Sequence, residues 1–229
     1  SASEIMAAAI QDYKRGIIIG SKTSYGKGTV QRFYDLDQYI VDDSDGLKPL
    51  GALKITTQKF FRIDGRSTQL KGVTPDIILP DGYTYIETGE KQKDFALPWD
   101  EIEPVPYAFW EKEIDMNDLK SKSERRVSKN KTFSMIDENA QRRKRNKDMT
   151  EYNLEFETYT DAFCQRQEEA DKYKDLQDEA LKFDVFALQA DLLEIAEDTV
   201  KQNMSKEWRE KLQKDTYLEE ALSVIQDAM

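Results

Sequence analysis

The sequence contains no histidine, a single cysteine and no long apolar run. Catalytic triads and dyads with an imidazole base, and metal sites with imidazole ligands, are therefore excluded within this chain. Cys164 cannot form an internal disulfide, and without a histidine partner we expect it to be a small buried side chain rather than a nucleophile. Apolar runs are as short as residues 17–19, so we expect no membrane-spanning helix.

Glycine and proline are missing from the second half of the chain. All ten glycines lie at or before Gly89, and all six prolines lie at or before Pro106. Tight turns are therefore expected in the first half and helices without tight turns in the second.

The charge is also unevenly distributed. The net charge is −6 over residues 1–119, +8 over 120–147 and −13 over 148–229, which gives −11 overall. A chain of 229 residues is long enough for two domains, each with its own core. We predict a domain at 1–98 and a helical domain at 99–229, because prolines interrupt any helix near this boundary.

The periodicity of apolar residues predicts the elements of both halves. A helix begins at the first residues, where Ser1 and Glu4 have capping-box spacing, and continues through Ile10. Extended segments are predicted at 16–20, 29–34, 53–63 and 75–80, the third followed by a hairpin-type turn at Asp64-Gly65. Two helix faces are predicted from steps of three and four, the first formed by Leu181, Val185, Leu188, Leu192 and Ile195, the second by Leu218, Ala221, Leu222 and Ile225.

Two loops resemble ligand-binding motifs without meeting their requirements. In residues 20–28 five residues separate the glycines where a phosphate-binding loop needs four, and a strand pattern rather than a helix follows. In residues 42–46 a calcium loop would place Val41 and Ala52 at ligand positions that need oxygen donors. We expect no nucleotide site in the first loop and a solvated turn in the second.

The basic block at 120–147 could contact phosphates. However, its only aromatic residue is Phe133, acidic helices flank it, and the chain as a whole carries a net negative charge. We therefore predict ion pairs within the chain and no nucleic-acid partner.

A serine hydrolase without histidine needs another base, and a neutral lysine can take this role. Ser1 and Ser3 lie at a predicted helix N-terminus, where backbone N–H groups and the helix dipole favour a developing negative charge. Lys27 lies between two glycines, just after an apolar strand that could desolvate its amine. Taken alone, this combination of residues is not specific.

A resemblance to a known family adds specificity. The sequence closely resembles the tail-specific or C-terminal processing proteases, which use a Ser/Lys dyad. The resemblance to the tail-specific branch extends in order to Asp100, and beyond it the chain is only weakly similar to that branch's helical C-terminal region. The matching motifs are Ser1-Ala2-Ser3-Glu4-Ile5, Gln11-Asp12, Gly26-Lys27-Gly28-Thr29-Val30-Gln31, Gln58-Lys59-Phe60, Ser67-Thr68-Gln69, Lys71-Gly72-Val73-Thr74-Pro75-Asp76-Ile77, Glu87-Thr88-Gly89-Glu90 and Ala96-Leu97-Pro98-Trp99-Asp100.

The resemblance implies a role for each matching site residue. Ser1 is the implied nucleophile, Lys27 the general base, and Gln31 the group that orients the Lys27 amine. The backbone amide of Ala2 is implied to donate to the oxyanion. Two further residues are implied to be structural: Ser3 and Asp12.

The sequence departs from the family pattern in two ways. The loop between Thr23 and Gly26 has one residue more than the family's usual Thr-Phe-Gly-Lys. The signal sequence, the PDZ domain and the first part of the protease core that family members carry before the nucleophile are absent, and with them a second oxyanion amide. We therefore expect an α+β fragment: the truncated C-terminal part of a mixed-sheet, crotonase-like ββα protease core followed by an all-α domain.

The expected function is that of a serine endopeptidase of the bacterial periplasm or cell envelope, in a fragment that is inactive alone. The resemblance implies no metal or organic cofactor. The expected partners are protein or peptide substrates bound as an added strand along a sheet edge, with homo-oligomerisation also possible. The alternative is that the helical half is an interaction module for an adaptor protein and has no activity of its own.

Overall fold

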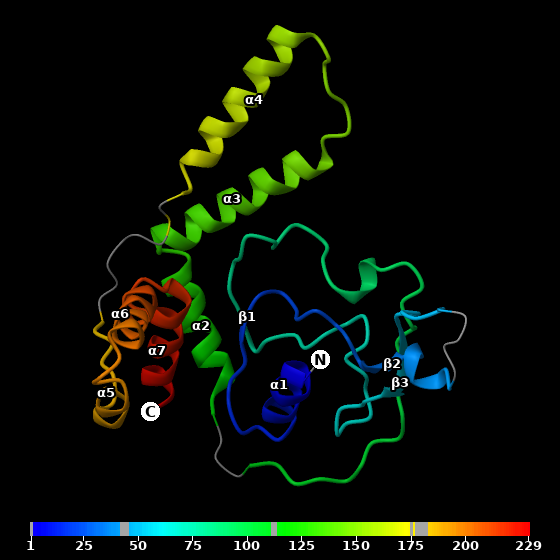
Figure 1. Cartoon of the computed structure of the whole chain (residues 1–229). Helices are drawn as coiled ribbons and strands as arrows, with labels where there is room; N and C mark the ends of the chain where they lie inside the picture. The colour runs from blue at the N-terminus through cyan, green and yellow to red at the C-terminus, as the bar shows by residue number, and fades with distance from the viewer. Residues whose placement is uncertain (1, 42–45, 111–113, 175, 177–182) are drawn as a thin grey trace. The chain divides into compact units, whose positions relative to one another are not determined.

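The computed structural model describes residues 2–41, 46–110, 114–174, 176 and 183–229 (Figure 1). The described chain forms two compact units in which segments distant in sequence interleave. The first unit contains the described residues of 1–18, 23–75 and 88–112, and the second unit contains those of 19–22, 76–87 and 113–229.

The first unit combines one helix with one hairpin. Helix α1 spans Ala2–Asp12, and the alanines among its first residues favour helix formation. Strands β2 (Thr29–Asp35) and β3 (Ala52–Lys59) pair antiparallel, with an irregularity in the register between Val30 and Gln31. Two short 3₁₀ helices follow β2 and Gly89, at Leu36–Tyr39 (η1) and Glu90–Gln92 (η2).

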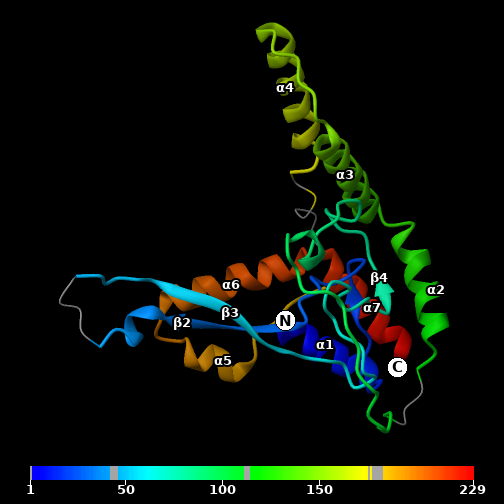
Figure 2. The ribbon, with the colours of Figure 1, turned by 90° about the vertical axis from the view of Figure 1, so that its right-hand side faces the viewer.

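The β2–β3 hairpin is unusually exposed to solvent, since every residue of β3 is exposed. Figure 2 shows β2 and β3 as a long two-stranded ribbon. A two-stranded hairpin is only marginally stable by itself, so the part of β2 nearest Lys27, where Thr29 is buried, anchors it to the unit.

The interior of the first unit is strongly polar. Ala8 and Val73 are buried beside polar residues that are at most 9% exposed: Glu4, Asp12, Thr29, Ser67, Thr68, Gln69 and Glu90. Most buried polar groups are hydrogen-bonded and so hold specific partners in place, although Thr68 Oγ1 has no hydrogen-bond partner among the described residues.

Among its described residues, the second unit contains a parallel sheet of two short strands and six α-helices. Strand β1 (Ile19–Gly20) pairs with β4 (Ile77–Ile78). Asp or Asn side chains cap α2, α3, α6 and α7 by accepting hydrogen bonds from the first-turn amides. The helices are α2 (Met116–Val127), α3 (Lys131–Asp148), α4 (Phe156–Asp171), α5 (Gln189–Glu194), α6 (Thr199–Gln213) and α7 (Thr216–Ala228).

The helical core of the second unit is formed by α2, α3 and α7. Phe133 is 2% exposed and meets the ring of Tyr217 edge-on, with 5.6 Å between the ring centroids. By contrast, none of the described helices α4, α5 and α6 contributes a buried residue.

The α+β class predicted from the sequence is confirmed, as are the strand at 29–34 and the helix that contains Leu218. No described helix is both long and apolar enough to cross a membrane. The predicted solvated turn at 42–46 falls largely outside the described residues, because the description omits 42–45.

Two strand predictions were too long. Only Ile19 and Gly20 of the segment 16–20 form a strand, and the segment 53–63 leaves the sheet after Lys59. The turn at Asp64-Gly65 forms, with the Gly65 amide 2.9 Å from the Arg62 carbonyl oxygen, but it does not connect two strands. A segment rich in β-branched residues forms a strand only where another strand is available to pair with it.

Two predictions for the second half are wrong. Val185 and Leu188 precede α5 instead of lying within a helix, while Leu181 lies outside the described residues. Leu188 is 71% exposed, and helical spacing alone does not hold a helix without a packing partner. Cys164 is exposed on α4 rather than buried, and no residue of that helix is buried.

Candidate functional site

The start of α1 carries the first group of predicted site residues. Ala2 is the first helical residue and is exposed, as is Ser3. Ser1, the predicted nucleophile, lies outside the described residues. Glu4, only 5% exposed, points away from solvent at the first turn of α1, where the helix dipole favours an acidic side chain.

The Glu4 carboxylate holds the loop at residues 23–28, which we call the lysine loop. Glu4 Oε1 accepts hydrogen bonds from Ser24 Oγ and from the Gly26 amide, each at 2.6 Å. Glu4 Oε2 accepts one from the Lys27 amide at 3.1 Å. Bonds to an ionised acceptor are stronger than neutral ones, so this side chain ties the lysine loop to the first turn of α1.

A second anchor comes from residues 67–70, of which 67–69 are buried. Gln69 Oε1 accepts from the Gly28 amide at 2.8 Å, and the Leu70 amide donates to the Gly26 carbonyl at 2.8 Å. Gly26 has φ +85°, and a Cβ there would lie 3.0 Å from the Leu70 backbone. The close approach therefore requires glycine on the N-terminal side of Lys27.

The structure brings two predicted site residues together. Lys27 Nζ donates a hydrogen bond to Gln31 Oε1 at 2.7 Å, and both residues are half-buried. Four residues of a regular strand would span about 13 Å. The turn into β2 and the register irregularity at Val30/Gln31 accompany this closer approach.

Asp12 lies at the other end of α1. Its carboxylate, buried with Arg62, accepts from Arg62 Nε at 3.0 Å and from Arg62 Nη2. Arg62 Nη2 also donates to Gln11 Oε1 at 3.0 Å. This pair fixes α1 against the segment that follows β3, two elements of the first unit.

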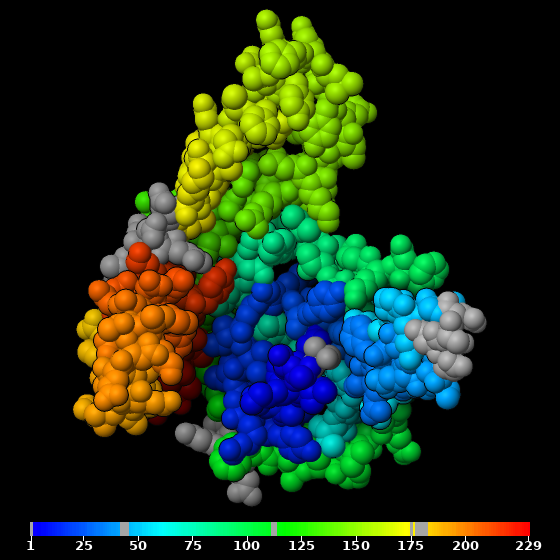
Figure 3. All heavy atoms as spheres, in the orientation of Figure 1, coloured from blue at the N-terminus to red at the C-terminus, as the bar shows by residue number. Residues whose placement is uncertain are grey.

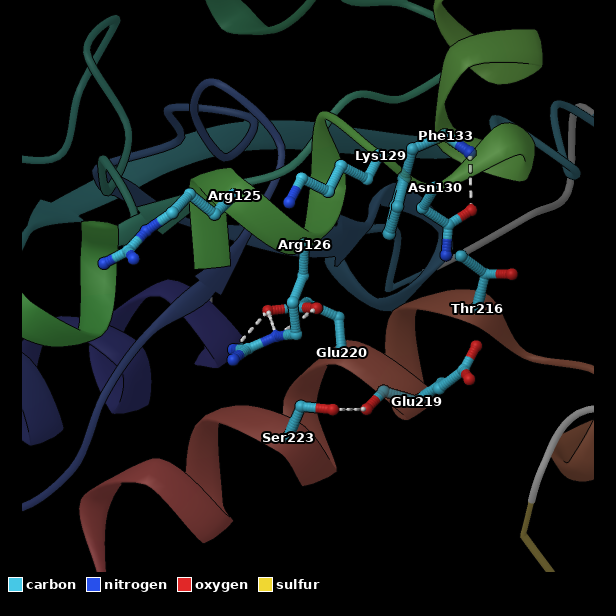
Figure 4. A pocket seen from close by; sticks show the side chains of 9 residues that line it. All are labelled: Arg125, Arg126, Lys129, Asn130, Phe133, Thr216, Glu219, Glu220 and Ser223. Carbon is cyan, nitrogen blue, oxygen red and sulfur yellow. Dashed lines mark hydrogen bonds and ion pairs between the residues drawn. The ribbon is translucent and has the colours of Figure 1, made fainter. Parts of the chain in front are cut away.

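The basic block predicted to form internal ion pairs does so in the second unit. A pocket of about 360 Å³ lies between the α2–α3 junction and α7 (Figure 4). On one side Arg126 Nη2 lies 2.8 Å from Glu220 Oε1, and Arg126 Nη1 lies 2.5 Å from Asp227 Oδ2. The hydrogen bond to Glu220 raises the pKa of Arg126. The positive charge that suggested phosphate binding is thus partly neutralised.

Comparison with known proteins identifies the family. A sequence model described as the C-terminal domain of tail specific protease matches residues 83–229. The chain belongs to the tail-specific protease family. The model of Peptidase family S41 matches residues 1–79, which contain α1 and the lysine loop.

Curated relatives agree with this family. The chain is 52% identical over 113 residues to the tail-specific protease of Haemophilus influenzae, a match that covers 47% of this chain and 15% of the relative. It is 41% identical over 87 residues to a carboxy-terminal-processing protease of Bartonella bacilliformis, covering 36% of this chain and 17% of the relative. A probable CtpA-like serine protease of Staphylococcus epidermidis is 35% identical over 105 residues, covering 41% and 19%. The chain thus spans less than a fifth of the length of these relatives.

Sequence reasoning missed the side chains that hold the lysine loop in place. From the sequence alone, Glu4 was identified only through its capping-box spacing and a matching motif, and Gln69 only through a matching motif. Both are buried polar residues whose partners lie 20 or more residues away along the chain. Their polarity inside otherwise apolar or turn-rich segments was the available signal.

Proposed function

We propose that this chain carries the Ser/Lys dyad of a tail-specific serine endopeptidase and supplies the C-terminal part of its catalytic core. The observation that supports the proposal most directly is the 2.7 Å hydrogen bond from Lys27 Nζ to Gln31 Oε1, which orients the amine. The Glu4 carboxylate adds support, since it ties the lysine loop to the helix turn that follows Ser1.

In the proposed mechanism Ser1 Oγ attacks the scissile carbonyl carbon while neutral Lys27 takes the hydroxyl proton. The Ala2 amide at the start of α1 donates to the oxyanion of the tetrahedral intermediate. Lys27 then delivers the proton to the leaving amine, and the acyl–enzyme forms. A water molecule, deprotonated by Lys27, attacks the acyl carbonyl carbon; the bond between this carbon and Ser1 Oγ breaks, Lys27 returns the proton to Ser1 Oγ, and the carboxylic acid product leaves.

The proposal includes the more specific predictions made from the sequence. The core belongs to a crotonase-like ββα fold, with residues 1–98 in the core and 99–229 in a helical domain. Polypeptide substrates add as a strand along a sheet edge, and the site of action is the bacterial periplasm or envelope. No cofactor takes part. The chain alone cleaves nothing, because losing one oxyanion donor already costs a factor of about a hundred to a thousand.

The test joins this chain to the preceding region of the Haemophilus influenzae relative and measures cleavage of an unfolded protein. Ser1→Ala and Lys27→Ala should each abolish cleavage, while the matched Ser3→Ala should have a mild effect. Lys27→Arg should also be inactive, since a guanidinium stays charged. If Ser3→Ala is inactive and Ser1→Ala is active, the assignment of the nucleophile is wrong.

A second candidate function is binding by the helical region, which could capture an adaptor or a second copy. The observation that favours it is the apolar surface on α4 and α6, where Phe163 is 52% exposed and Trp208 is 61% exposed. Exposed apolar patches mark interaction sites. A partner retained by the full chain and lost in Phe163→Ser would support this candidate.

A further inference from the structure

A short segment of the first unit contacts the lysine loop at Tyr25. The Glu90 amide donates a hydrogen bond to the Tyr25 carbonyl oxygen at 2.8 Å. Gly89, with φ +105°, lies so close that a Cβ would be 2.4 Å from the same oxygen. Only glycine fits both this backbone conformation and this distance, so the contact is built into the sequence at Gly89-Glu90.

Side chains reinforce the backbone contact. Glu90 is 7% exposed, and its carboxylate oxygen Oε2 lies 3.2 Å from Lys93 Nζ. Lys93 Nζ in turn lies 5.6 Å from the centroid of the Tyr25 ring. The interaction with Glu90 raises the pKa of Lys93.

The contact matters because Tyr25 lies in the middle of the lysine loop, two residues before Lys27. Its two neighbours, Ser24 and Gly26, both donate hydrogen bonds to the Glu4 carboxylate. Tyr25 itself has a half-exposed side chain, and its carbonyl oxygen accepts from the Glu90 amide. The lysine loop is thus held by two separate partners, immediately before Lys27.

We propose that Gly89, Glu90 and Lys93 form a latch that fixes the lysine loop, and that Glu90 is a positioning residue for the Lys27 amine. The catalytic meaning of the latch rests on the proposed function, whereas its effect on the loop does not. The latch lies within 83–229, the part that matches the tail-specific protease C-terminal domain, while Lys27 lies in the part that matches the peptidase model. The latch and Lys27 lie in the same compact unit, so the start of the region that matches the C-terminal-domain model holds the loop that carries Lys27.

The test uses the full 229-residue chain and two variants that differ by one N–H group. Glu90→Pro removes both the amide donor and the carboxylate, and Glu90→Ala removes only the carboxylate. Glu90 is the first residue of η2, a position where proline is tolerated. The readouts are amide hydrogen exchange of residues 23–28, with β3 as internal reference, and the rate at which acetic anhydride acylates Lys27, with Lys54 as reference.

Glu90→Pro should speed amide exchange in the lysine loop about fivefold, which is the effect expected from losing one backbone hydrogen bond. It should also speed the acylation of Lys27. The pH profile of Lys27 acylation should change, while that of Lys54 should not. Glu90→Ala should change exchange by less than about twofold, since an ion pair with an exposed lysine contributes little. If the two variants show equal amide exchange in the lysine loop and equal pH profiles of Lys27 acylation, the latch proposal is wrong.

A second pair of variants covers the case in which Glu90→Pro also loosens β2 and β3. Gly89→Ala places a Cβ against the Tyr25 carbonyl, whereas Gly51→Ala has similar backbone strain at φ +81° but nothing within 4 Å. Only Gly89→Ala should speed exchange and acylation in the lysine loop, and equal effects of the two would refute the proposal. Neither readout requires cleavage. If the latch variants behave as expected but the dyad variants fail the cleavage test, the proposed function is wrong while the latch proposal stands.

Discussion

Replacing Glu4 should destabilise the first unit strongly. Glu4→Ala removes the acceptor of three hydrogen bonds, from Ser24 Oγ and from the amides of Gly26 and Lys27. The Gly26 amide is buried, and leaving it unpaired costs about 2 kcal/mol. Ser24 and Lys27 are half-buried, so water can replace part of their bonds, and each adds about 0.5–1 kcal/mol. The expected destabilisation is about 3–4 kcal/mol.

Glu4→Gln provides the graded comparison. Its carbonyl oxygen can still accept from Ser24 and Gly26, but its NH₂ group then faces the Lys27 amide, donor against donor. The expected loss is about 1–2 kcal/mol. Ser3→Ala, one residue earlier and exposed, is the control and should change stability by less than about 0.5 kcal/mol.

The assay is urea unfolding followed by tryptophan fluorescence. Trp99 and Trp110 belong to the first unit and Trp208 to the second, so Trp208→Phe makes the signal specific to the first unit. A Glu4→Ala variant that unfolds within 0.5 kcal/mol of its parent, the scale of a neutral surface change, would refute the view that this carboxylate anchors the lysine loop.

Two further predictions concern the second unit. Burial raises the pKa of Tyr217 to about 12, and its hydroxyl donates to the Pro80 carbonyl oxygen at 2.9 Å. The unfolded chain therefore loses this proton first as pH rises, so the stability that the protonated phenol provides should be complete below pH 10 and lost between pH 10 and 12. Tyr217→Phe removes the ionisable phenol, so this variant should lose less stability between pH 10 and 12, as measured by thermal unfolding over this pH range. Arg126→Met should cost about 2 kcal/mol, because it leaves the buried Glu220 without its partner, whereas Lys144→Met breaks an exposed pair and should cost less than about 0.5 kcal/mol. Equal unfolding midpoints for these two variants would contradict the ranking.

Local patterns were sufficient where an element's own residues decide its structure. The alanines of α1, the alternation at 29–34 and the apolar spacing around Leu218 each predicted an element that the structure contains. The pairing of Lys27 with Gln31 came from family resemblance, since spacing by four in a strand does not by itself indicate contact.

Long-range contacts explain what the sequence could not predict. Glu4 meets the lysine loop 22 residues later, and Glu90 meets Tyr25 across more than 60 positions. The failed helix over Val185 and Leu188 shows the converse, since an apolar spacing without a packing partner did not form a helix. Burial of Cys164 was expected from its residue type alone, yet the packing of α4 decided its exposure.

The double anchoring of Ser24 and Gly26 has a consequence for how the length of this loop can vary. With both flanking residues fixed to the same carboxylate, a residue inserted between them can loop outward without displacing Lys27. Tyr25, 50% exposed, is the residue between them. Length differences among homologues should therefore occur between these two fixed residues, where an alignment gap leaves the position of Lys27 unchanged. The same position is suited to attaching a reporter group close to Lys27.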